Sequence, residues 1–283
     1  MRRDFEVLVQ EALKDRYRVE REIGRGGGAR VFLARDAAGR AVALKVLHPE
    51  LLTDLAADRF LREMQVVAQL HHPNIAPLVD SGARGWLVFY AMRYIEGPSL
   101  RRRLDAGGPL GVEETRRLAA DLLAALDHAH ARGIVHRDVK PENIVLAAAG
   151  AVLLDFGIAR AIAASAGDRV TRTGTAVGTS TYMSPEQIRG VRELDPRSDL
   201  YSVGCVLFEC LAGEPPFVHA NELVVLRRHL TEAAPPLRAR RSDAPPDLAS
   251  AVDRALAKEP SDRWPSAAEM ARALGISLAA GTP

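Results

Sequence analysis

Polar residues suited to phosphate and metal chemistry gather in one short stretch of the chain. Asp138, Lys140 and Asn143 lie in the run HRDVKPEN at 136–143, and Asp155 follows twelve residues after Asn143 in the run DFG. Carboxylate and carboxamide oxygens are ligands that suit Mg²⁺, and a carboxylate can accept a proton from a hydroxyl group. The segment therefore predicts a site that holds magnesium around a nucleotide and accepts a hydroxyl proton.

A glycine-rich run, GRGGGARV at 24–31, lies between two β-like runs near the amino terminus. Glycine has no Cβ, so its backbone N–H groups can approach phosphate oxygens closely. A flexible hairpin is the alternative interpretation, and this pattern alone leaves both open. A dinucleotide-binding loop would lead into a helix, whereas Val31-Phe32-Leu33 continues as a strand. A Walker-type loop would need Gly-Lys-Ser/Thr, which the run lacks.

The elements that must position these residues fall into two groups. Before about Leu100 the chain has one helix, at 54–70, among β-like runs at 17–23, 30–35, 41–47, 75–80 and 86–92. Beyond Leu100 a small hairpin joins Ile144–Leu146 to Val152–Leu154, and helices are expected at 112–131, 199–211, 221–230, 246–257 and 266–274. Residues 1–16 are expected to form a short helix outside this pattern. The sequence thus predicts an α+β fold with a small β-rich lobe before a larger helical lobe.

Size and composition are those of a globular protein with a sizeable core. The chain has 283 residues, of which 47% are hydrophobic and 26% charged, enough for one large domain or two lobes. The formal net charge of +2 gives no support to nucleic-acid binding. We expect the basic clusters Arg101-Arg102-Arg103 and Arg238/Arg240/Arg241 to be solvated surface.

The sequence also favours a cytoplasmic enzyme. It has no signal peptide and no apolar run near the roughly 18 residues that span a membrane. Cys205 and Cys210 lie in one apolar stretch and would face different ways on a helix. We expect them to be buried free thiols in a reducing compartment.

Taken in order, these motifs resemble those of the protein kinases, specifically the bacterial Ser/Thr kinases of the eukaryotic-like (Hanks) type. The resemblance covers roughly residues 17–275. It is carried by GRGGGARV at 24–31, VALK at 42–45, Glu63, HRDVKPEN at 136–143, DFG at 155–157, GTSTYMSPE at 178–186, DLYSVGC at 199–205 and Arg263. It implies the two-lobed kinase fold, with an extension at 1–16, an N-lobe at about 17–95, a C-lobe at about 96–275 and a tail at 276–283.

The resemblance implies how ATP would be bound. Lys45 would contact the α- and β-phosphates while paired with Glu63, and Gly24 and Gly26 would lie beside the phosphates. The adenine would lie against Val31, Ala43 and Val145. Backbone groups of Arg93 and Ile95, just beyond Met92, would bind its edge.

The same resemblance implies how phosphate would be transferred. Asp138 would orient the acceptor hydroxyl and take its proton, while Lys140 would lie near the γ-phosphate. Asn143 and Asp155 would hold Mg²⁺, with Mn²⁺ as a second option. Asp199 would brace the catalytic loop, Glu186 would pair with Arg263, and His136 would pack beside Phe156. Because no catalytic residue is missing, we expect an active enzyme; a pseudokinase-like signalling scaffold is the alternative.

Further matches to the family imply which residues accept the phosphate and how the enzyme would be regulated. Lys140 and Thr179 favour Ser/Thr acceptors in protein substrates, and the run at 178–186 favours a peptide acceptor over a small molecule. Thr171 and Thr173 are expected to be autophosphorylated, in trans within a homodimer, and Arg137 would then bind the phosphate. Many bacterial relatives continue into a membrane anchor, so membrane attachment would depend on a segment beyond residue 283.

Overall fold

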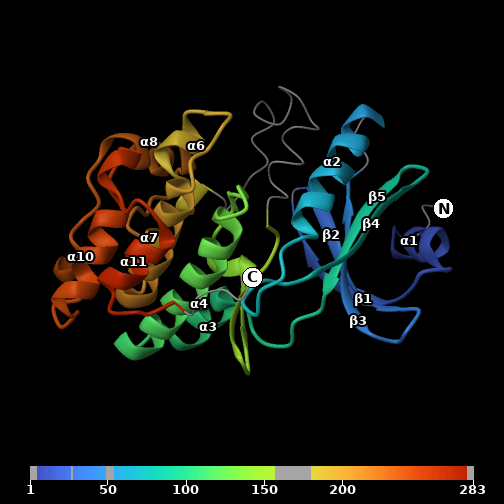
Figure 1. Cartoon of the computed structure of the whole chain (residues 1–283), viewed down its shortest axis with the longest axis horizontal. Helices are drawn as coiled ribbons and strands as arrows, with labels where there is room; N and C mark the ends of the chain where they lie inside the picture. The colour runs from blue at the N-terminus through green and yellow to red at the C-terminus, as the bar shows by residue number, and fades with distance from the viewer. Residues whose placement is uncertain (1–4, 27, 49–53, 157–179, 279–283) are drawn as a thin grey trace. The chain divides into compact units, whose positions relative to one another are not determined.

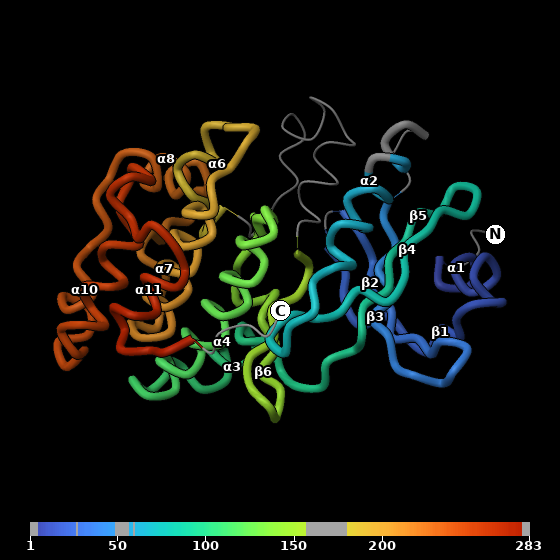
Figure 2. Tube along the Cα trace, viewed as in Figure 1, coloured from blue at the N-terminus to red at the C-terminus, as the bar shows by residue number. Residues whose placement is uncertain are grey.

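The computed structural model describes residues 5–26, 28–48, 54–156 and 180–278 of the chain. The described residues group into two compact units (Figures 1 and 2). Of the described residues, those up to 71 and those at 76–95 form the first unit, and those at 72–75, 96–156 and 180–278 form the second. The expected division into a β-rich part and a larger helical part is confirmed.

The first unit is built on a five-stranded antiparallel sheet. Its strands are β1 (Tyr17–Arg25), β2 (Ala29–Asp36), β3 (Ala41–Leu47), β4 (Leu78–Arg84) and β5 (Leu87–Arg93), in the order β1-β2-β3-β5-β4. Side chains alternate between the two faces of a strand. On one face, Phe32, Leu44 and Phe89 are fully buried.

Two helices cover opposite faces of this sheet, as Figure 1 shows. Helix α1 (Phe5–Leu13) buries Val9 and Leu13 against the face that carries Phe32. Helix α2 (Asp54–Val67) packs on the other face, where the ring of Phe60 lies 6.0 Å from that of Tyr90.

The second unit is mainly helical. Its α-helices are α3 (Leu100–Gly107), α4 (Val112–His130), α6 (Pro185–Ile188), α7 (Arg197–Ala212), α8 (Glu222–Thr231), α9 (Leu237–Arg240), α10 (Pro246–Ala255) and α11 (Ala267–Ala273). Helix α7 is buried on all sides from Ser198 to Leu211 and contacts α4 and α10. This burial explains why its sequence is apolar without the single stripe of a surface helix. Cys205 and Cys210 are free and fully buried within it, as predicted.

A small hairpin of β6 (Ile144–Ala147) and β7 (Gly150–Leu153) completes this unit. Residues 72–75 are fixed to it, because Asn74 Nδ2 donates to Ala151 O at 2.8 Å and Leu153 N donates to Asn74 O at 2.9 Å. The predicted strand at 75–80 is therefore wrong at its start. Ile75 forms a single bridge to Leu153, and β4 begins only at Leu78.

In the part of the chain that the structure describes, no helix is both long and apolar enough to cross a membrane.

Helix α3 was absent from the expected elements. Its sequence, LRRRLDAG, has apolar residues only at Leu100 and Leu104, which is too little for a clear periodicity. The helix is started by Ser99, whose side chain accepts a hydrogen bond from Arg102 N.

Candidate active site

The predicted catalytic residues of the second unit meet in one hydrogen-bonded group. Asp138 and Lys140 lie in the loop after α4, and Asn143 ends a 3₁₀ turn over Pro141–Asn143 that leads into β6. Lys140 Nζ lies 2.8 Å from Asp138 Oδ2. Asn143 Nδ2 donates to the same carboxylate oxygen at 2.9 Å and to Asp138 O at 2.8 Å. Three of the residues singled out by spacing are thus brought into contact.

This arrangement leaves two oxygen atoms available for chemistry. Both recorded contacts to the Asp138 side chain are made by Oδ2, so its Oδ1 accepts no hydrogen bond from the described residues. Asn143 uses its amide nitrogen on Asp138, and its Oδ1 likewise has no partner among them. A carboxylate oxygen and a carboxamide oxygen therefore remain for a hydroxyl proton and a hard cation.

Asp199 of α7 fixes the backbone of the catalytic loop through hydrogen bonds. Its Oδ1 accepts from Arg137 N at 2.8 Å, and its Oδ2 accepts from His136 N at 2.7 Å and lies 2.8 Å from His130 Nε2. Burial opposes ionisation of this carboxyl group, but the hydrogen bond and charge of His130 outweigh it, so the pKa of Asp199 lies below its usual value. The predicted brace of the catalytic loop is present.

His136 is a structural residue, as predicted. Its Nδ1 accepts a hydrogen bond from Asp138 N at 3.1 Å, so its Nε2 must carry the proton that is donated to Leu154 O at 2.7 Å. The His136 ring also packs edge-on against Phe156 at 4.5 Å. With both nitrogens engaged by the backbone, the imidazole connects the Asp138 loop to the segment that carries Asp155.

Two residues of this region hold a left-handed backbone. Arg137 has φ 71° and Asp155 has φ 62°. This conformation costs non-glycine residues energy and recurs at functional sites. Leu154 N donates to Asn143 O at 2.8 Å, so the residue before Asp155 is joined directly to Asn143. The two predicted metal ligands therefore come from neighbouring, hydrogen-bonded segments.

The donor types fit Mg²⁺ or Mn²⁺ better than a metal ion that prefers nitrogen or sulfur ligands. Asn143 and Asp155 supply oxygen atoms only, and Mg²⁺ takes one or two protein ligands besides phosphate and water. Among the described residues, no group of three or more His, Cys, Asp or Glu side chains could hold a metal ion. A site that relies on few protein oxygens is thus the kind of metal site that this part of the chain can offer.

A buried ion pair holds the segment that begins at Ser180. Arg263, which is fully buried, donates from Nη1 and Nη2 to the two carboxylate oxygens of Glu186 at 2.6 and 2.9 Å. Ser198 Oγ also donates to Glu186. The predicted pairing of Glu186 with Arg263 is confirmed. Such two-pronged contacts between guanidinium and carboxylate are strong and directional.

Two contacts in this segment escaped prediction. Gln187 Nε2 donates to Arg137 O at 2.7 Å, which joins the segment to the catalytic loop. Gln187 also completes a capping box with Ser184 at the start of α6. The spacing Ser-x-x-Gln at 184–187 is a recognised signal for such a box, so the start of this helix could have been predicted from the sequence. The hydrogen bond to Arg137 could not, because no local pattern indicates it.

The expectation of solvated arginines was wrong for Arg101. Arg101 Nη1 lies 2.6 Å from Glu209 Oε1, and Tyr182 Oη donates to Glu209 Oε2 at 2.6 Å. Glu209 is buried, so it needs these partners to stay charged. In the second cluster, Arg241 donates to Leu110 O and Leu211 O, whereas Arg238 and Arg240 are exposed as expected.

The predicted nucleotide residues of the first unit share one face of its sheet. Val31 is opposite Lys45 across β2 and β3, and Ala43 is opposite Met92 across β3 and β5. Directly opposed residues point to the same face, so Val31, Ala43 and Lys45 lie on the face where α2 packs. Gly24 is opposite Val31. Glu63 belongs to α2, and its pairing with Lys45 stays a prediction.

Backbone hydrogen bonds at the end of β5 determine which groups of Arg93 and Ile95 could bind an adenine. Arg93 N already donates to Pro77 O at 3.0 Å, so only the carbonyl of Arg93 remains as a partner. Ile95 N donates to no other group in the described residues. Val145, the adenine contact predicted in the second unit, lies in β6. Gly26, whose amide donates to Ala29 O at 2.9 Å, closes the glycine-rich loop.

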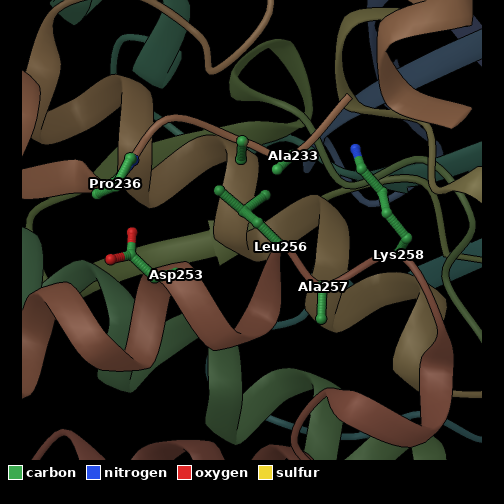
Figure 3. A pocket seen from close by; sticks show the side chains of 7 residues that line it. Ala233, Pro236, Asp253, Leu256, Ala257 and Lys258 are labelled. Carbon is green, nitrogen blue, oxygen red and sulfur yellow. The ribbon is translucent and has the colours of Figure 1, made fainter. Parts of the chain in front are cut away.

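Three predicted residues fall outside the part of the chain that the structure describes, and one cavity has no catalytic residue in its lining. Thr171, Thr173 and Thr179 fall outside the described residues. A cavity of about 220 Å³ in the second unit is lined by Ala233, Ala234, Pro236, Asp253, Leu256, Ala257 and Lys258 (Figure 3). No predicted site residue lines it. Its lysine is already engaged, because Lys258 Nζ donates to Arg228 O and lies 4.4 Å from the ring of Phe217.

The sequence resembles known proteins over almost its full length. A profile of the protein kinase domain matches residues 17–273. Serine/threonine-protein kinase PknB of Mycolicibacterium smegmatis is 43% identical over 271 residues, which are 93% of this chain and 43% of that protein. PknB of Mycobacterium leprae is 44% identical over 278 residues, 96% of this chain and 44% of that protein. PknB of Mycobacterium tuberculosis is 44% identical over 265 residues, which are 91% of this chain and 42% of that protein. The chain spans less than half the length of these relatives.

Proposed function

Because this chain belongs to the protein kinase family, we propose that it transfers the γ-phosphate of Mg-ATP to serine and threonine hydroxyls of proteins. Three residues of the catalytic loop carry this proposal. Lys140 Nζ and Asn143 Nδ2 meet at one oxygen of Asp138, 2.8 and 2.9 Å away. The contact fixes a carboxylate beside an ammonium group and a carboxamide whose oxygen would bind the metal ion, an arrangement that suits phosphoryl transfer to a hydroxyl.

Asp138 is the residue that would act on the acceptor. Since Oδ2 is held by Lys140 and Asn143, Oδ1 is the atom that would accept the hydroxyl proton. As the acceptor oxygen bonds to the γ-phosphorus, the bond from that phosphorus to the bridging oxygen breaks and ADP leaves. The enzyme contributes little covalent chemistry, so positioning and charge neutralisation would supply most of the rate.

Asn143 Oδ1 and the Asp155 carboxylate would hold Mg²⁺ or Mn²⁺. When bound, the ion would neutralise phosphate charge and orient the phosphate chain. Lys140 would add a second positive charge near the γ-phosphate. The connection from Leu154 N to Asn143 O supports this assignment, because it keeps the two ligand segments in register.

The first unit would bind the nucleotide through the sheet face that carries Val31, Ala43 and Lys45. The apolar side chains would contact the adenine, together with Val145, and Lys45 would reach the α- and β-phosphates. We propose that Glu63 orients Lys45, since α2 lies on the same face. The Arg93 carbonyl and the Ile95 amide would bind the adenine edge.

Protein acceptors are favoured by the segment after residue 180. Glu186 is fixed by Arg263, and Gln187 ties the segment to the backbone of Arg137. A platform joined to the catalytic loop would place a peptide hydroxyl near Asp138. Lys140 and Thr179 are the residues from which we infer Ser/Thr rather than Tyr acceptors.

We further propose that Thr171 and Thr173 are autophosphorylated in trans within a transient homodimer. A phosphate brings about −1.5 to −2 charges, and a guanidinium can bind two of its oxygens. Arg137 would supply that guanidinium beside Asp138. The double change Thr171→Ala/Thr173→Ala should lower turnover at least about tenfold. Unchanged activity in this variant would rule out the switch, and labelling that does not accelerate with enzyme concentration would rule out transfer in trans.

The test of the main proposal is transfer of label from γ-labelled ATP with Mg²⁺ to a protein substrate. The wild-type chain should produce phosphoserine and phosphothreonine, and Asp138→Asn should form them at least about a hundredfold more slowly. The pseudokinase alternative predicts no labelling by the wild-type chain.

A cytoplasmic location is also proposed, since Cys205 and Cys210 are both free thiols.

A further inference from the structure

The two ends of the glycine-rich loop are joined by one carboxylate. Arg25 ends β1 and Arg30 lies at the start of β2, and the two residues are opposite each other in the sheet. Glu22 accepts from Arg25 Nε at 2.9 Å and from Arg25 Nη2 at 3.1 Å. Arg30 Nη2 donates to the same carboxylate. Arg25 first, and then Arg30, lower the pKa of Glu22 to about 2, so the link is charged at neutral pH.

Helix α1 closes over the other side of Arg30. The Arg30 guanidinium carbon lies 4.5 Å from the ring centre of Phe5 and 5.3 Å from that of Phe32. Phe5 in turn packs against Phe32 at 6.4 Å and Trp86 at 5.7 Å. Only 12% of the Arg30 side chain is exposed. A guanidinium held over aromatic rings with little water gains a favourable cation–π interaction.

Helix α1 is firmly attached to the sheet, so it can serve as an anchor. Val9 and Leu13 are fully buried against the sheet. The Gln10 side chain bonds to the free edge of β1, where its Nε2 donates to Tyr17 O at 3.1 Å and its Oε1 accepts from Val19 N at 2.7 Å. These contacts fix the position of Phe5 at the start of the same helix.

Resting on the proposed kinase function, we propose that Phe5, Arg30 and Glu22 are positioning residues for the nucleotide. They set the spacing of the two ends of the glycine-rich loop and so hold it in the form that binds ATP phosphates. Arg30 directly precedes Val31, whose side chain lies on the sheet face that carries Lys45 and would bind the nucleotide. A shift of Arg30 therefore moves a predicted adenine contact and the loop together.

Physical reasoning favours this role over simple packing. Glycines lose more backbone freedom on ordering than other residues, and a site that is ordered beforehand binds its ligand more tightly. The described residues of the loop make two backbone hydrogen bonds, from Gly26 N to Ala29 O at 2.9 Å and from His48 N to Gly28 O at 3.0 Å. Fixing Arg25 and Arg30 adds restraint at both ends.

The test compares variants of the N-terminal helix. Phe5→Leu keeps an apolar side chain on Phe32 and Trp86 but removes the ring beside Arg30. We expect it to weaken Mg-ADP binding about threefold, and Phe5→Ala about three- to tenfold, with kcat unchanged at saturating ATP. Val7→Ala is the matched control, because Val7 lies on the same helix with 54% of its surface exposed. It should bind ADP as the wild type does.

Hydrogen exchange separates this role from general loss of stability. In Phe5→Leu, exchange should accelerate at Gly24, Gly26 and Val31 and stay unchanged in the hairpin of β4 and β5. Arg30→Lys should retain part of the ADP affinity that Arg30→Gln loses. Equal exchange and equal ADP affinity in Phe5→Leu and Val7→Ala would overturn the inference. A wild-type chain that binds no Mg-ADP would instead refute the proposed function, which is seen before any variant is made.

Discussion

Replacing Asp199 by Asn should weaken both the fold and the catalytic loop. The buried carboxylate receives two backbone N–H groups, from His136 and Arg137, and the His130 imidazole, at 2.7 to 2.8 Å. Asn has the same shape but only one acceptor oxygen, so its NH₂ group must face at least one of these donors. A buried donor left without a partner costs about 1–3 kcal/mol, and the remaining bonds lose the benefit of the charge, about 1 kcal/mol more.

The expected loss is therefore about 2–4 kcal/mol in the free energy of unfolding, measured by urea denaturation. Because His136 and Arg137 directly precede Asp138, turnover should also fall at least about tenfold under conditions where the variant is folded. Asp195→Asn is the matched control, since Asp195 pairs with Arg197 at the protein surface and should lose under about 1 kcal/mol. Equal stability and turnover in the two variants would refute the proposed brace.

Two other buried groups give predictions for stability. Arg263→Leu leaves Glu186 without its guanidinium and should lower the free energy of unfolding by about 3–5 kcal/mol, whereas Arg189→Leu, at the surface, should lower it by under about 1 kcal/mol; urea titrations that gave similar midpoints would contradict this. Burial first, and then the positive charge of Lys258, lower the pKa of His229 to about 4, so the unfolded chain binds its proton at higher pH than the folded chain does. Stability should therefore fall by about 2 kcal/mol more in the wild type than in His229→Gln between pH 7.5 and pH 5, and parallel pH profiles would show that His229 does not contribute.

The sequence was most informative where local pattern and chemistry agree. Alternation placed β3 at 41–47, and the apolar stripe of α4 placed that helix to within one residue. The motif at 136–143 also identified Asp138, Lys140 and Asn143, which the structure brings into contact. Residues close together in sequence and rich in polar groups have few ways to be far apart in space.

Contacts between residues that are far apart in the sequence were harder to predict. Arg101 and Glu209 are 108 residues apart, and an arginine cluster gives no local sign that one member pairs with a buried carboxylate. The attachment of residues 72–75 to β7 also depends on a tertiary contact, made by Asn74. Phe5 looked like part of a peripheral helix, because its significance arises only from the placement of Arg30 beside it.

The role of Asp138 is tested most directly by measuring binding and transfer separately in Asp138→Asn. The side chain keeps its shape and can still contact Asn143, so Mg-ADP affinity should stay within about twofold of the wild type. The rate of phosphate transfer in a single turnover should fall by about 10²–10⁴-fold, because the group that accepts the hydroxyl proton is lost. Equal single-turnover rates in the two proteins would contradict the assignment of Asp138 as the proton acceptor.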